Sequence, residues 1–69
     1  MPIEHKKQYG VYHWDTFDNE TILMHEANDL ETADKWVKEH YKGRISFDGA
    51  DRVDIVDKNG LVVGKFYVR

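Results

Sequence analysis

The amino-acid sequence predicts an α+β domain of element order ββαββ, in which a four-stranded, mainly antiparallel sheet carries one helix packed on one face. Two pairs of segments alternate apolar and polar residues with the two-residue period of β-strands. Between these pairs, one segment repeats apolar residues at helical spacing. Residues 1–69 contain no repeat or low-complexity tract, so we expect a single small globular domain. Because one helix covers only one face of a sheet, the other face is predicted to stay open or to meet a partner.

The first two strands are predicted over residues 8–16 and 21–27, where β-branched and aromatic side chains alternate with other residues. Residues 17–20 form the turn between them. If Asp18-Asn19 closes a tight turn, Tyr12 lies opposite His25 and Trp14 opposite Leu23 on one side of this hairpin. Either side of the hairpin satisfies the pattern for packing against the helix. The side opposite Tyr12, Trp14, Leu23 and His25 carries Tyr9, Val11, His13, Ile22 and Met24.

The helix is predicted over Asp29–Lys42. Asn28 or Asp29 can cap its first turn, because a short side-chain oxygen accepts from the unpaired backbone amides there. Gly43 can adopt the left-handed conformation that ends a helix. Five apolar residues recur at three- and four-residue steps and are predicted to face the sheet: Leu30, Ala33, Trp36, Val37 and Tyr41.

The segment 44–51 mixes apolar residues with Asp48-Gly49 and is predicted to be a loop. We expect its apolar side chains, Ile45 and Phe47, to plug the end of the hydrophobic core. A short strand is the alternative for this segment.

The last hairpin is predicted to close through Asn59-Gly60, a pair that favours a two-residue turn with both residues at positive φ. In this register Asp54 lies opposite Lys65 and can form a cross-strand ion pair. A three-residue loop with a bulge at Gly60 would place Lys65 beside Val53 on the buried side, where an unpaired ammonium is costly. The two-residue turn is therefore predicted, and the face toward the helix collects Val53, Ile55, Val62, Phe66 and Val68.

The open sheet face is the predicted working surface of a binding or accessory protein that acts by contact. A domain of this size has a small core and no cysteine, so sharing a surface with a second copy would stabilise it. We therefore expect a protein partner, with a homodimer formed through the sheet as the favoured form. The candidate contact residues are Tyr12, His13, Trp14, Met24 and Tyr67.

A nucleic-acid-associated regulator is the alternative, because bases stack on aromatic side chains of open sheets. The formal net charge of -3 disfavours contact with phosphates. Acidic residues also follow the aromatic pair Tyr12 and Trp14, whereas such a surface needs basic ones.

Catalysis, cofactors and metal ions are not expected from this composition. The chain has no cysteine nucleophile, a single serine at Ser46 and no glycine-rich phosphate loop. His13 and His25 project from opposite sides of the hairpin in the tight-turn register, so a metal site built from both would require a one-residue slip of the pairing. The absence of cysteine fits a reducing compartment, and no segment has the length of a signal peptide or a membrane span. We expect a cytoplasmic protein with no membrane partner.

Overall fold

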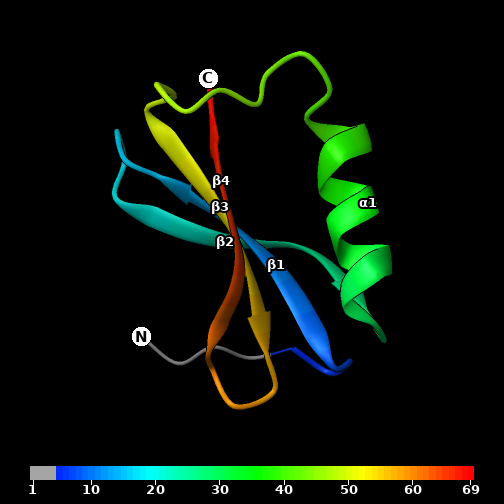
Figure 1. Ribbon diagram of the computed structural model, residues 1–69. Coiled ribbons are helices and arrows are strands. Elements are labelled where there is room, and N and C mark those ends of the chain that lie inside the picture. Colours follow the sequence, from blue (N-terminus) through cyan, green and yellow to red (C-terminus); the bar gives the residue numbers. More distant parts are fainter. Residues whose placement is uncertain (1–4) are drawn as a thin grey trace.

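The computed structural model describes residues 5–69 and has the predicted order ββαββ (Figure 1). Its four strands form one antiparallel sheet in the order β2-β1-β3-β4, and the single helix packs on one face of that sheet. The predicted fold is therefore confirmed. The elements are β1 (Tyr9–Asp15), β2 (Glu20–Ala27), α1 (Leu30–His40), β3 (Asp51–Asp57) and β4 (Val62–Val68).

The hydrophobic core lies between α1 and the sheet. Trp36 and Phe66 pack against its border and are only partly buried, and Leu30 at the first turn of the helix is exposed. Of the apolar helix residues predicted to face the sheet, Ala33, Val37 and Tyr41 are therefore the ones buried in the core. Removing this apolar surface from water is the main force that holds the helix on the sheet. The buried cluster consists of Val11, Ala27, Ala33, Val37, Tyr41, Val53, Ile55 and Val68.

Helix α1 begins and ends by the predicted signals. The Asp29 carboxylate accepts from the Thr32 amide at 2.7 Å, which caps the first turn. At the other end, the Tyr41 amide donates to the Val37 carbonyl, and Gly43 adopts a φ of 80°. The helix is shorter than predicted, because residues 41 and 42 already belong to the turn.

The first hairpin differs from its predicted register. Asp15 pairs with Glu20, so the turn has four residues, and the Asp15 carboxylate accepts from the amides of Phe17 and Asp18. The pairing then shifts by one residue at a bulge, because Val11 lies opposite His25 but Tyr12 lies opposite Leu23. The predicted pairs Tyr12–His25 and Trp14–Leu23 are therefore wrong. The bulge turns His25 to the same side of the sheet as Val11, toward the helix.

The second hairpin combines a three-residue loop with a bulge that restores the predicted register. Asp57 and Leu61 close the loop, and Gly60 has a φ of 85° while Asn59 does not have positive φ. The predicted two-residue turn is wrong. A register shift beside Val56 leaves Val63 as the extra residue, so Lys65 still lies opposite Asp54, as predicted. Val62 moves to the face away from the helix, where it lies opposite Val56.

The loop between α1 and β3 lies along the edge of β4. Ile45 forms an isolated bridge with Val68, and the Ser46 amide donates to the Tyr67 carbonyl. Phe47 is 96 % exposed and Ile45 is also exposed, so the prediction that they plug the core is wrong. Backbone pairing with β4 holds this loop at the sheet edge. The buried side chain of Tyr41, rather than Ile45 or Phe47, contributes to the core.

Candidate functional site

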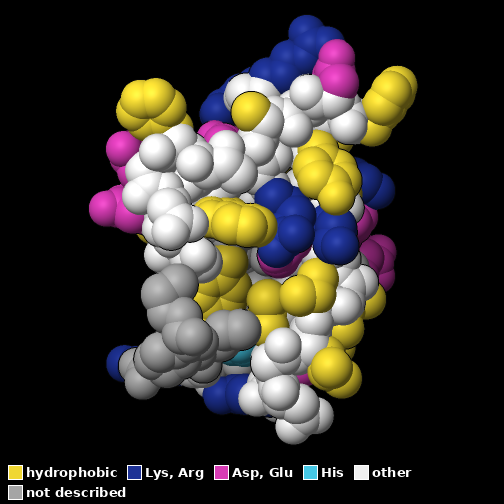
Figure 2. Space-filling view, turned by 90° about the vertical axis from the view of Figure 1, so that its left-hand side faces the viewer, with side chains coloured by type: hydrophobic (Ala, Val, Ile, Leu, Met, Phe, Trp, Pro, Cys, Tyr) yellow, Lys and Arg dark blue, Asp and Glu magenta, His cyan; other side chains and the backbone are white. Residues whose placement is uncertain are grey.

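The face of the sheet opposite α1, called the open face, presents side chains from all four strands (Figure 2). Alternation along each strand places every second residue on this face, with one change of phase at each bulge. Its side chains are Thr21, Leu23 and Glu26 from β2, Tyr12 and Trp14 from β1, Arg52, Asp54 and Val56 from β3, and Val62, Lys65 and Tyr67 from β4.

Residues 5–7, called the N-terminal strap, cover one part of the open face. The Lys58 ammonium donates to the carbonyls of His5 and Lys6 at 3.2 and 2.8 Å. From the opposite edge, the Glu26 carboxylate accepts from the amides of Lys6 and Lys7. The amide of Lys6 is the main cause that lowers the pKa of Glu26. The strap is thus held by Glu26 of β2 on one side and by Lys58, in the loop between β3 and β4, on the other.

Tyr12 lies beneath the strap. Its hydroxyl is 3.0 Å from Nδ1 of His5, and its side chain is only 8 % exposed. Gly10 makes room for this contact, since a Cβ at that position would lie 2.8 Å from the His5 ring. Tyr12 is therefore covered by the protein's own chain.

The remaining part of the open face is centred on Arg52. Its guanidinium carbon lies 4.7 Å from the centroid of the Trp14 ring, which is a cation–π geometry. Its Nε lies 3.1 Å from one Asp54 carboxylate oxygen and donates to the other at 3.2 Å. Asp54 thus pairs with Arg52, and the predicted ion pair with Lys65 is not formed. Lys65 has no acceptor among residues 5–69.

An open hollow of about 300 Å³ lies beside Arg52. Val62, Val63, the Gly64 backbone and Lys65 line its other sides, so two cationic side chains flank an apolar wall. We call the uncovered area around it the contact patch. It consists of Trp14, Leu23, Arg52, Val62, Lys65 and Tyr67.

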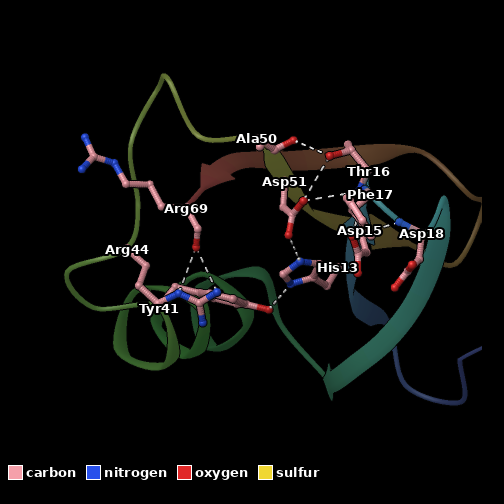
Figure 3. Close-up of polar contacts among 10 residues, drawn as sticks. All are labelled: His13, Asp15, Thr16, Phe17, Asp18, Tyr41, Arg44, Ala50, Asp51 and Arg69. Atoms are coloured by element: carbon pink, nitrogen blue, oxygen red, sulfur yellow. Dashed lines mark hydrogen bonds and ion pairs between the residues drawn. The ribbon is translucent and has the colours of Figure 1, made fainter.

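On the helix side, a chain of polar side chains links α1 to the sheet (Figure 3). His13 places Nδ1 at 2.8 Å from the Tyr41 hydroxyl and Nε2 at 3.0 Å from the Asp51 carboxylate. A neutral imidazole satisfies both contacts, because Nε2–H donates to Asp51 while Nδ1 accepts from Tyr41. Thr16 donates to the same carboxylate at 3.2 Å. Burial raises the pKa of Tyr41, and the His13 hydrogen bond is the main cause that lowers the pKa of Asp51.

This chain of side chains gives stability a predicted pH dependence. The pKa of Asp51 is lowered in the folded state, so its contribution is complete above the unfolded value of about 3.9 and is lost as pH falls through the folded value. We expect Asp51→Asn to lose less stability than the wild type when the pH is lowered below that value. Urea denaturation at neutral and acidic pH measures the difference. Identical acid sensitivity of the two proteins would contradict the assignment.

His25, His40 and Met24 also lie on the helix side. Met24 is the bulged residue of β2 and packs against the core. The rings of His25 and Trp36 stack at 4.7 Å, and those of Trp36 and His40 at 4.4 Å. The prediction that His13 and His25 point to opposite sides is thus wrong. No group of three His, Cys, Asp or Glu residues that could hold a metal occurs within residues 5–69.

Two of the five predicted contact residues, Trp14 and Tyr67, lie together on the contact patch. Tyr12 shares the face but lies under the strap, whereas His13 and Met24 belong to the helix side. The prediction omitted Arg52 and Lys65, although their alternation with Val53 and Phe66 placed them on the open face. What the sequence did not reveal is that β1 and β3 are neighbours, which brings Arg52 onto Trp14.

No family model matches this chain, and comparisons with curated proteins and with solved structures found no match either. None of the helices within residues 5–69 is long and apolar enough to cross a membrane. The geometry of the contact patch is therefore the basis for assigning a function.

Proposed function

We propose that this protein is a small, non-catalytic binding domain that associates with a second copy of itself through the contact patch. The observation that carries the proposal is the uncovered part of the open face. There Leu23, Val62 and Tyr67 are 39, 48 and 41 % exposed. Burying such apolar surface against a second copy is favourable, and closed two-fold dimers are the commonest assembly.

Features of both sheet edges support face-to-face packing over pairing of edge strands. The edge strands β2 and β4 each contain a bulge, which interrupts the regular ladder that another strand would need. The end of β4 is also paired with the loop at Ile45 and Ser46. The open face is thus the better surface for association.

The contacts of Arg52 and the net charge of the protein argue against nucleic acid as the partner. Arg52 already lies over the Trp14 ring, so that side of the indole is not open to a base. The carboxylate of Asp54 also offsets the charge of Arg52. With a net charge of -3, the protein as a whole repels phosphates.

The variant Tyr67→Glu tests the proposal. A carboxylate in the middle of an apolar interface would be desolvated, so we expect the dimer dissociation constant to rise at least about tenfold, equivalent to about 1.4 kcal/mol. The urea midpoint should stay close to that of the wild type, because the side chain is partly exposed. Sedimentation velocity over a concentration series measures the association.

Phe47→Glu is the matched control, because it makes a similar exchange at an exposed position outside the contact patch. It should associate like the wild type. Equal association of Tyr67→Glu and Phe47→Glu would contradict the proposed interface. Unfolding of Tyr67→Glu would instead show that the open face is assigned to the wrong side.

A further inference from the structure

The two ends of the open face carry side chains of opposite charge. At the end where β1 begins, the N-terminal strap presents Lys7, which is exposed and whose ammonium has no acceptor among residues 5–69. The turn between β1 and β2 lies at the opposite end of the sheet (Figure 1). In that turn Asp18 is exposed, and its carboxylate has no partner in the described part of the chain. One molecule cannot bring these two groups together, because the length of the sheet separates them.

Lys7 is the lysine of the strap whose charge is not matched within the chain. The amide of Lys6 is the main cause that lowers the pKa of Glu26, and the positive charge of Lys6 adds to this effect. Lys6 therefore has a carboxylate near its ammonium. Lys7 acts on Glu26 through its backbone amide only.

The turn between β1 and β2 also exposes an aromatic ring. Phe17 is 94 % exposed, although its amide is held by the Asp15 carboxylate at 2.9 Å (Figure 3). The amide of Asp18 donates to the same carboxylate. A turn that is already held in this way loses little conformational freedom on binding. A lysine suits it, because the ammonium pairs with a carboxylate while the aliphatic stem packs on an apolar ring.

The strap restricts how two open faces can pack against each other. It stands above the sheet, because the His5 ring lies over Gly10 and contacts the Tyr12 hydroxyl. A two-fold axis parallel to the strands would place the same end of both sheets together. The two straps would then face each other, hold the sheets apart and bring like charges together. An axis that crosses the strands places the straps at opposite ends of the dimer instead.

This crossing axis brings each strap to the turn of the other copy. It keeps each strand over the same strand of the partner and reverses the strand direction. Glu26 holds the strap at one end of β2, and Glu20 follows the turn at the other end. Leu23 of the contact patch lies between them. With the axis close to Leu23, the contact patches face each other and the strap–turn contact forms twice.

We propose that the N-terminal strap binds the β1–β2 turn of a second copy, with Lys7 at the Asp18 carboxylate and the Phe17 ring. This inference rests on the self-association proposed above and names the contact that orients the two open faces. Each copy carries a net charge of -3, so the copies repel each other as a whole. A local match of opposite charges at both ends of the interface selects the crossing orientation.

The variant Asp18→Lys separates this contact from general electrostatics. It makes the net charge of -3 less negative by two, so general repulsion alone would fall and association would strengthen. The proposed contact predicts the opposite result, because two lysine side chains meet at each end of the dimer. We expect the dissociation constant to rise by about fivefold to tenfold. Sedimentation equilibrium measures it.

A charge exchange completes the test. Lys7→Glu alone places two carboxylates together at each end and should also raise the dissociation constant by about fivefold to tenfold. In a mixture of Lys7→Glu and Asp18→Lys, the heterodimer pairs opposite charges at both ends. We expect this mixture to recover an affinity within about threefold of the wild type. A strap that Lys7→Glu had merely loosened would show no recovery.

Lys35→Glu and Glu39→Lys are the matched controls. They change the net charge by the same amounts at exposed positions on α1, away from the open face. Glu39→Lys should associate at least as tightly as the wild type, because it only reduces the general repulsion. Lys35→Glu should stay within about twofold of the wild type.

The outcomes separate this contact from self-association itself. Weaker association of Asp18→Lys than of Glu39→Lys, together with recovery in the mixture of Asp18→Lys and Lys7→Glu, supports the contact. Equal association of Asp18→Lys and Glu39→Lys, or no recovery in that mixture, overturns the contact while the interface at Tyr67 stands. A wild type that stays monomeric overturns both.

Discussion

Replacing Ile55 with alanine is expected to lower the free energy of unfolding by about 3 kcal/mol. Ile55 is fully buried in the central strand β3, between the helix and the sheet. Its side chain also extends over Gly64, where a Cβ would lie 3.0 Å from Cδ1 of Ile55. Truncation removes apolar contacts and leaves a cavity that neighbouring backbone cannot fill. In a domain of this size the core supplies about 3–5 kcal/mol, so much of the population should unfold.

The matched control for this prediction is Ile22→Ala. Ile22 lies on the edge strand β2 and is 48 % exposed, so the same truncation should change stability by only about 0.5 kcal/mol. Urea denaturation followed by circular dichroism measures both variants. Equal losses of stability would contradict the placement of the core.

Replacing Gly49 with alanine is expected to cost about 1–3 kcal/mol, for a different reason. A Cβ at this position would lie 2.4 Å from the carbonyl oxygen of Val68 and 2.5 Å from its carbonyl carbon. Because these are backbone atoms in β4, no rotamer change relieves the clash. The loop must move away from the strand and weaken its hydrogen bonds through Ser46 and Arg69.

Gly43→Asn provides the comparison for Gly49→Ala. Gly43 has a φ of 80°, which asparagine tolerates, and no atom lies within 4 Å of its Cβ position. Its cost should be clearly smaller. Chemical denaturation compares the two, and amide exchange at Ser46 and Arg69 reports whether the loop has moved. Unchanged exchange in Gly49→Ala would contradict the close packing of this loop on β4.

The fold was predictable because its signals are local. Alternating residues marked the strands, and the Asp29 cap together with the apolar stripe marked the helix. The failures lie at the turns and bulges. Met24 follows the apolar Leu23 and Val63 follows the apolar Val62, so the sequence does not reveal that either is an extra residue in its strand. One extra residue moves every side chain beyond it in the strand to the opposite face of the sheet.

The candidate site was less predictable, because it depends on contacts between distant segments. The strap at residues 5–7 has no alternating pattern, and only Gly10, which leaves room beside Tyr12, indicates that another part of the chain approaches there. Trp36 fitted the core by spacing, yet it lies partly exposed between two histidine rings. Trp14 and Tyr67 could be placed on the open face, whereas the position of Arg52 over Trp14 required the order of the strands.

Sedimentation equilibrium of the untagged wild-type protein, from low micromolar to near millimolar concentration, is the most direct test of self-association through the open face. The apparent mass should rise with concentration from the monomer value of 8.2 kDa toward that of a dimer. A mass of 8.2 kDa at every concentration would contradict self-association and would leave the contact patch without its proposed partner.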